Sequence, residues 1–285
     1  MRWQGRRQSD NVEDRRGAGG RGLKIGGGVG GIGIVIAILY FLLGGNPSEI
    51  TQTLQVDQPY AAGPEGSLSV KDKEMGEFVS TILASIEDVW RAKFQESGET
   101  YQDPKLVLFS GQADSACGFA GAASGPFYCP GDAKVYIDLS FFEDMQRELG
   151  APGDFALAYV IAHEVGHHVQ NLLGINDQVM ARRGRMPERD FNKLMVRMEL
   201  QADFLAGVWA HYANLERDFL EAGDIEEGMN AASAVGDDRI MKQTRGYVVP
   251  DAFTHGTSEQ RVRWFRKGLE TGDIAQGDTF GAARL

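Results

Sequence analysis

The pattern of apolar and polar positions sets off one long apolar run near the N-terminus. Residues 25–45 (IGGGVGGIGIVIAILYFLLGG) contain no charged side chain. As a helix, 21 residues span about 30 Å, which is the thickness of the hydrocarbon core of a bilayer. The pattern therefore predicts a single transmembrane helix at 25–45, with a cleavable signal peptide as the alternative.

After a polar linker at 46–68, the remaining residues 69–285 have the pattern of one globular domain. Ser69 is expected to cap a helix whose apolar positions recur with helical spacing up to Trp90. Further helices are predicted at 141–149, 153–173, 188–221, 224–243 and 257–270, the last of them starting with a capping box.

Two short segments, 105–110 (KLVLFS) and 134–139 (KVYIDL), have the character of strands. The glycine-, alanine- and serine-rich residues 111–131 between them predict an ordered loop. We therefore expect an α+β domain, rich in helix and with a small β-sheet.

Charge is divided unevenly about the apolar run. Residues 1–24 contain seven Lys/Arg and three Asp/Glu, a net +4, whereas residues 25–285 contain 22 and 37, a net −15. The positive-inside rule then makes 1–24 a basic cytoplasmic tail and puts the acidic domain outside a bacterial cytoplasmic membrane. Gly26 and Gly30 have the spacing of membrane-helix dimers, but a glycine-rich anchor contains such pairs by chance, so a homodimer is only weakly indicated.

Composition excludes two classes of protein. The chain is 42% hydrophobic and 24% charged, which is typical of globular proteins and argues against disorder. An acidic domain without a basic patch is not expected to bind nucleic acid.

The candidate chemistry lies in the helix at 153–173, which contains His163-Glu164-Val165-Gly166-His167. Two histidines four residues apart lie on one helix face, so both imidazoles can bind one Zn²⁺. Glu164, beside the first histidine, can direct its carboxylate at a metal-bound water and act as general base.

A catalytic zinc needs a third protein ligand and an open position. Glu199 and Asp203 lie four residues apart in the apolar helix at 188–221, where carboxylates are costly without a metal or a cation. We expect Glu199 to be the third ligand and Asp203 to accept a hydrogen bond from a ligand imidazole. His168, His211 and His255 are the alternative third ligands.

Cys117 and Cys129 are the two cysteines of the chain. Outside the cytoplasm a disulfide between them is the economical interpretation, with free or metal-binding thiols as the alternative.

HEVGH followed by ELQAD resembles the gluzincin clan of metallopeptidases. The wider chain, including the segment 116–142 and residues 254–265 (THGTSEQRVRWF), resembles the bacterial family of membrane-anchored neutral zinc metallopeptidases. The resemblance implies a zincin-like domain in which zinc is bound by His163, His167 and Glu199.

Further roles are implied by the clan. The strand before the zinc helix, with residues Val135, Tyr136, Ile137, Asp138 and Leu139, would pair with an extended substrate. A second electrophile would stabilise the oxyanion, with His255 as first candidate and Tyr247 as second. Arg261 is a candidate partner of a site carboxylate.

The sequence thus predicts a membrane-anchored zinc endopeptidase that acts on protein or peptide substrates. The alternative is a zinc-binding envelope protein without catalytic activity, which binds a partner.

Overall fold

The computed structural model describes residues 1–16, 68–121, 125–216 and 219–285. Its α-helices, in chain order, are α3 (Val70–Glu96), α4 (Ser140–Arg147), α5 (Asp154–Leu172), α6 (Ile175–Met180), α7 (Glu188–Leu215), α8 (Asp224–Ala234), α9 (Asp237–Arg245) and α10 (Ser258–Thr271). The strands are β1 (Val12–Asp14), β2 (Lys105–Phe109), β3 (Gln112–Ser115), β4 (Gly118–Gly121), β5 (Phe127–Cys129) and β6 (Lys134–Asp138). Short 3₁₀ turns lie at η2 (Pro250–Ala252) and η3 (Ile274–Gln276). The expected helix-rich α+β fold with small sheets is confirmed.

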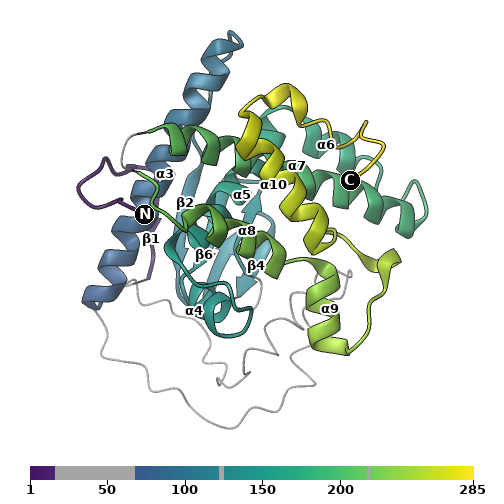
Figure 1. Cartoon of the computed structure of the whole chain (residues 1–285), viewed down its shortest axis with the longest axis horizontal. Helices are drawn as coiled ribbons and strands as arrows, with labels where there is room; N and C mark the ends of the chain where they lie inside the picture. Colours follow the sequence, from purple (N-terminus) through teal and green to yellow (C-terminus); the bar gives the residue numbers. More distant parts are fainter. Residues whose placement is uncertain (17–67, 122–124, 217–218) are drawn as a thin grey trace.

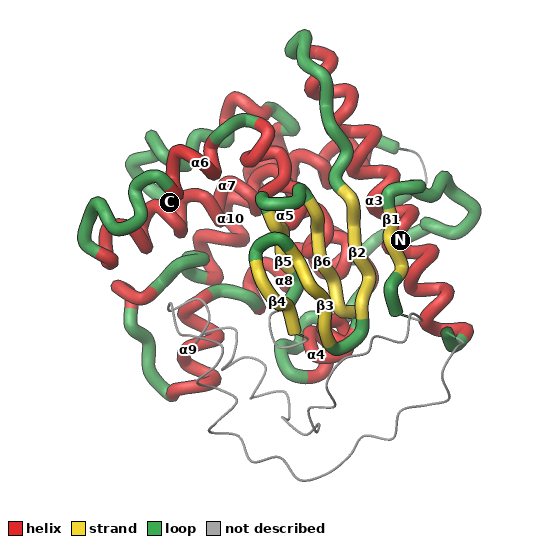
Figure 2. The backbone as a smooth tube through the Cα atoms, turned by 180° about the vertical axis from the view of Figure 1, so that it is seen from behind, coloured by secondary structure: helices red, strands yellow, loops and turns green. Residues whose placement is uncertain are grey.

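The main sheet has the strand order β1-β2-β6-β5. β1, β2 and β6 run parallel, and β5 pairs with β6 in the antiparallel direction. The hairpin β3–β4 forms a second small sheet, which lies over the strands of the main sheet in Figure 2, while the helices lie behind them.

Side chains alternate between the two faces of the sheet along each strand, and both faces contain buried residues. Leu106, Leu108 and Ile137 point into the main core, which they share with the helices. On the opposite face Val107 and Tyr136 form a smaller core with residues of the hairpin and of β5. The sheet is therefore a central layer between the helices and the hairpin.

At the starts of α3 and α10 and at the end of α5, local signals mark the helix boundary near the residue that the sequence predicts. The Ser69 side chain accepts a hydrogen bond from the Asp72 amide at the start of α3, and Thr257 does the same with Gln260 at the start of α10. Gly174 follows the end of α5 in the left-handed region at φ 70°, which glycine adopts without strain.

Three predicted elements differ from the structure. The predicted loop 111–131 contains β3, β4 and β5. The predicted helix 224–243 is two helices, separated at Val235 and Gly236, and the helix predicted to reach residue 221 ends at Leu215. The short helix α6 was not predicted.

Residues 1–16 are the described part of the predicted tail at 1–24, and they pack against the domain. β1 is the edge strand beside β2, and Trp3 is buried against Phe78 of α3. The N-terminus, β1 and α3 lie together in both views (Figures 1 and 2).

Among the described residues, no helix has both the length and the apolar character needed to cross a membrane. The predicted transmembrane helix at 25–45, its glycine pairs and the linker at 46–68 lie outside the described residues, apart from residue 68.

Candidate metal centre

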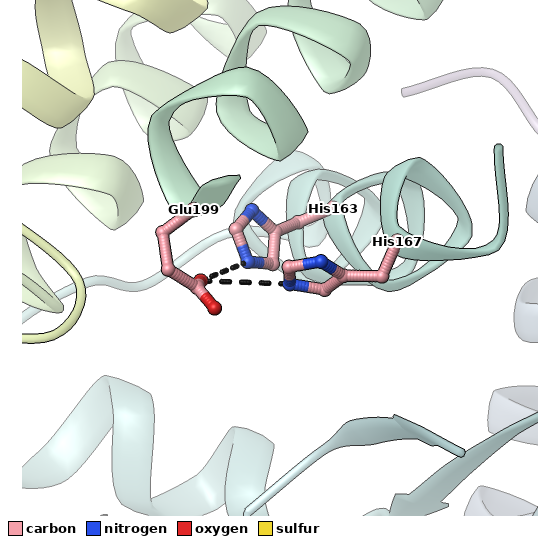
Figure 3. Close-up of side chains that lie close together, drawn as sticks. All are labelled: His163, His167 and Glu199. Atoms are coloured by element: carbon pink, nitrogen blue, oxygen red, sulfur yellow. Dashed lines mark hydrogen bonds and ion pairs between the residues drawn. The ribbon is translucent and has the colours of Figure 1, made fainter. Parts of the chain in front are cut away.

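Helix α5 presents His163 and His167 one turn apart. Their ring centroids are 4.8 Å apart, and the ring planes are inclined at 85°. α5 is buried along most of its length, so its position in the core fixes the direction of both imidazoles. Figure 3 shows both rings pointing from α5 toward Glu199 of α7.

Glu199 completes a group of three possible ligands. Its Oε2 atom lies 3.2 Å from Nε2 of His163 and 3.5 Å from Nε2 of His167. α7 comes this close because α5 has no side chain at Gly166, where a Cβ atom would lie 3.0 Å from the carbonyl oxygen of Ala202. Gly166, the fourth residue of the HEVGH motif, therefore helps to bring Glu199 to the histidines.

Asp203 lies behind His163, as the sequence predicts. Its Oδ1 atom is 2.9 Å from Nδ1 of His163, on the side of the ring opposite Glu199. Tyr159 donates a hydrogen bond to the same oxygen at 2.5 Å. Arg261 donates two hydrogen bonds to Asp203, one from Nε to Oδ2 at 2.8 Å and one from a terminal guanidinium nitrogen to Oδ1 at 2.9 Å. Asp203 is thus a buried carboxylate with three hydrogen-bonding partners, and it fixes the orientation of His163.

His167 has a different partner. Its Nδ1 atom lies 2.9 Å from Oε1 of Gln170, and the Gln170 amide donates to the carbonyl oxygen of Met198 and to Gln201. Both imidazoles therefore have Nδ1 engaged and Nε2 directed at Glu199, which is the arrangement of ligand histidines with fixed tautomers.

Burial and charge act on these groups in opposite directions. Burial lowers the pKa of His163, but Asp203 and Glu199 more than compensate and raise it to about 9. Burial raises the pKa of Asp203, but the charges of Arg261 and His163 lower it to about 2. Burial likewise raises the pKa of Glu199, while His167 and His255 bring it well below its usual range. Both carboxylates are therefore ionised at neutral pH.

The donor set fits zinc. One atom from each of His163, His167 and Glu199 lies within 4.8 Å of the other two. Two imidazole nitrogens and one carboxylate oxygen are ligands that Zn²⁺ takes in catalytic sites. Glu164 is buried, and among the described residues no hydrogen bond or ion pair of its carboxylate is found. A carboxylate beside the ligand group thus remains available for proton transfer.

His255 is not one of the three possible ligands, but it lies near enough for its charge to lower the pKa of Glu199. Asp237 accepts hydrogen bonds from the backbone amides of residues 254–256 at 2.8, 2.7 and 3.0 Å and lies 3.4 Å from Nδ1 of His255. Burial lowers the pKa of His255, but the charges of Glu199 and Asp237 raise it above its usual value.

The other candidate side chains are engaged elsewhere or are exposed. His168 bridges Tyr128 and the carbonyl oxygen of Gln102, and His211 lies 2.7 Å from the carbonyl oxygen of Leu269. Tyr247 is 63% exposed, and no contact with the ligand group is found for it among the described residues.

The predicted substrate strand, residues 135–139, is paired on both sides over its first two residues. Val135 and Tyr136 of β6 pair with β2 on one side and with β5 on the other. Their position between two strands leaves no open edge for a substrate strand. Ile137 and Asp138 also pair with β2. The edge strand on this side of the sheet is β5, and Tyr128 of β5 contacts α5 through the 3.0 Å bond to His168.

The Cys117–Cys129 disulfide is confirmed. Cys117 lies in the turn of the β3–β4 hairpin and Cys129 at the end of β5. The bridge therefore ties the hairpin to the edge strand.

Comparison with known proteins identifies the family. Residues 1–280 match the family described as "Putative neutral zinc metallopeptidase". The chain belongs to this family. It is 50% identical to protein YpfJ of Escherichia coli (strain K12) over 288 aligned positions, which cover 99% of each chain. Proteins Mb2605 of Mycobacterium bovis and Rv2575 of Mycobacterium tuberculosis are each 44% identical over 211 positions, about 70% of either chain. No solved structure matches the chain.

Two residues that contact this candidate zinc site were not predicted from the sequence. Each of them lies at a helical spacing from a histidine that could have indicated it. Tyr159 precedes His163 by four residues and so shares its helix face. Gln170 follows His167 by three residues, which is also same-face spacing. Both positions also fit an ordinary amphipathic helix, so the spacing alone does not single them out.

Proposed function

We propose that the protein hydrolyses peptide bonds at the group formed by His163, His167 and Glu199, with zinc bound there. The observation that carries the proposal is the convergence of these three side chains from two helices, with the Asp203 network behind His163. When bound, zinc supplies a Lewis acid that polarises the scissile carbonyl and lowers the pKa of water.

The side chains have distinct roles in this proposal. Glu164 takes the proton of the attacking water and passes it to the leaving amine. His255, held by Asp237 and with its pKa raised, donates a hydrogen bond to the oxygen that becomes negative in the transition state. Asp203 keeps His163 in the tautomer that leaves Nε2 free for the metal.

We propose that an extended substrate lies along β5, because β5 is the edge strand that contacts the zinc helix. Edge strands bind peptides through backbone hydrogen bonds, which tolerate many side chains. The Cys117–Cys129 bridge holds this edge to the hairpin and also favours a position of the domain outside the cytoplasm, where disulfides persist.

The test uses the full chain, wild type and Glu164→Gln, with the exposed Glu188→Gln as matched control. Zinc is measured by elemental analysis, and cleavage is measured with an unfolded protein such as casein. We expect about one zinc per chain in all three proteins and loss of cleavage in Glu164→Gln alone. Absence of zinc would overturn the ligand assignment, and unchanged cleavage by Glu164→Gln would overturn the role of the base.

A further inference from the structure

Residues 1–16 are joined to the domain by regular backbone hydrogen bonding. The three residues of β1, Val12–Asp14, pair in parallel register with residues 106–108 of β2. The amide of Leu106 donates to the carbonyl oxygen of Asn11 at 2.9 Å, and the amide of Arg15 donates to that of Leu108 at 2.8 Å. β1 is thus a full strand of the main sheet.

The same residues satisfy a buried charge on α3. Glu87 is 1% exposed, and a buried carboxylate destabilises a fold unless it is hydrogen-bonded. Its Oε1 atom accepts hydrogen bonds from Ser9 at 2.5 Å and from Asn11 at 2.8 Å. Its Oε2 atom lies 3.6 Å from a guanidinium nitrogen of Arg7 and 3.5 Å from one of Arg91, which belongs to α3 itself. Without residues 1–16, Glu87 would lose both of these hydrogen-bond donors.

Residues 1–16 also contact α3 through hydrogen bonds and aromatic packing. Ser9 and Ser80 exchange two hydrogen bonds, from the Ser9 amide to the Ser80 carbonyl and from the Ser80 hydroxyl to the Ser9 carbonyl. Trp3 packs edge-on against Phe78 with the ring centroids 5.4 Å apart. These contacts bury apolar surface as well as polar groups, so they hold the segment in one place.

The arginines of this segment have carboxylate partners. Ion pairs with the domain join Arg2 to Glu221, Arg6 to Glu216 and Arg7 to Asp88. Arg15 and Arg16 pair with Glu13 and Asp14 of the segment itself. Each exposed pair contributes little to stability. Together they show that the basic charge near the N-terminus complements the acidic domain.

We propose that residues 1–16 are a structural part of the peptidase domain and lie on the same side of any membrane as the metal ligands. A segment on the opposite side could not form β1 or bind Glu87 in the same molecule. A single membrane crossing between residues 16 and 68 is incompatible with this arrangement. The inference is independent of catalytic activity.

The first test compares the sides of the membrane on which two single cysteines lie. Gln8→Cys and Glu96→Cys, both at exposed positions, are introduced separately into the full chain and expressed in Escherichia coli. The native cysteines are joined to each other, and the chain without an added cysteine gives the background. Labelling of spheroplasts by a membrane-impermeant maleimide is measured as a fraction of labelling after permeabilisation, with a cytosolic protein as control.

We expect the same labelled fraction at positions 8 and 96, whether both react in intact spheroplasts or both only after permeabilisation. The proposal is overturned if one cysteine reacts in intact spheroplasts and the other does not.

The second test asks whether the segment is held by the domain. A protease site inserted between residues 18 and 19 is cut in the purified full chain, and the mixture is passed over a size-exclusion column. We expect the N-terminal fragment to elute with the domain, and to be released when Trp3→Ala removes the buried ring. Release of the wild-type fragment would contradict docking. Equal retention of the Trp3→Ala fragment would contradict the contribution of this contact.

Discussion

At the scale of single residues, the site depends on one buried carboxylate. Asp203 accepts hydrogen bonds from Tyr159 and from two nitrogens of Arg261, and it contacts Nδ1 of His163. The guanidinium fork of Arg261 fixes the plane of the carboxylate, which a lysine ammonium cannot do. Arg261 therefore contacts His163 of the candidate metal group through Asp203, and we expect it to act as a positioning residue.

We predict that Arg261→Lys weakens zinc binding by roughly tenfold, the lower end of the range for residues that orient a ligand. The measurement is competition for zinc with a chromophoric chelator, which does not depend on peptidase activity. Arg266→Lys is the matched control, because Arg266 lies exposed on the same helix. An affinity equal to that of the wild type would show that Arg261 does not position Asp203 for the site.

A second prediction concerns the proton that His163 releases when zinc binds. Because the pKa of His163 is raised to about 9, its imidazole is charged at pH 7 when no metal is bound. Zinc binds the neutral imidazole, so binding at pH 7 should release about one proton from His163, and this release should fall as the pH rises through about 9. Calorimetric titration in buffers of different ionisation enthalpy measures the number of protons that are released when zinc binds. Binding enthalpies that are identical in all buffers at pH 7 would contradict the charged state of His163.

The three residues of the candidate metal group could be named from the sequence, whereas the residues that support them could be named only in part. His163, His167, Glu199 and Asp203 lie at helical spacings that are fixed by local geometry. Arg261 could be named only as a candidate partner of an unspecified site carboxylate, because its contact with Asp203 depends on how α10 packs on α7.

At the scale of elements, two glycines set the distance between α7 and α10. A Cβ atom at Gly207 would lie 2.1 Å from the carbonyl oxygen of Phe265, and one at Gly268 would lie 2.1 Å from that of Phe204. The helix backbones therefore touch here, and this contact sets the position from which Arg261 reaches Asp203.

We predict that Gly268→Ala lowers the free energy of unfolding by about 3 kcal/mol, since overpacking against a backbone cannot be relieved by a rotamer change. Urea denaturation measures this. Gly76→Ala in α3 is the control, because a Cβ atom there meets mainly the movable guanidinium of Arg16, at 2.7 Å. If both variants lose the same stability, the close approach of α7 and α10 is not the cause.

Element prediction succeeded where the pattern was local and failed where it was not. The capping boxes at Ser69 and Thr257 mark the helix starts. The strands in 111–131 were missed because glycine, alanine and serine carry little apolar alternation there. The order of the sheet was missed as well, because β1 is 91 residues away from β2 along the chain, counted from Asp14 to Lys105.

At the scale of the whole molecule, the basic charge near the N-terminus has partners in the acidic domain. A basic segment before an apolar run predicts an orientation in a membrane. In the structure, three arginines of that segment pair with carboxylates of the acidic domain. The order of charges along the chain predicts a membrane topology. In three dimensions, the same arginines are complementary in charge to the domain on which they lie.

Metal binding should also stabilise the whole molecule, because its ligands lie on α5 and α7, two helices of the main core. A ligand that binds only the folded state at about 1,000 times its Kd adds about 4 kcal/mol to the free energy of unfolding. In a domain of this size that corresponds to a rise in Tm of roughly 10 °C. We predict this rise when zinc is added to the metal-free protein, measured by calorimetry. Glu164→Gln should show the same rise, since Glu164 is not a ligand, whereas Glu199→Gln should show much less. An equal rise in Glu199→Gln would mean that zinc binds elsewhere or without the carboxylate of α7.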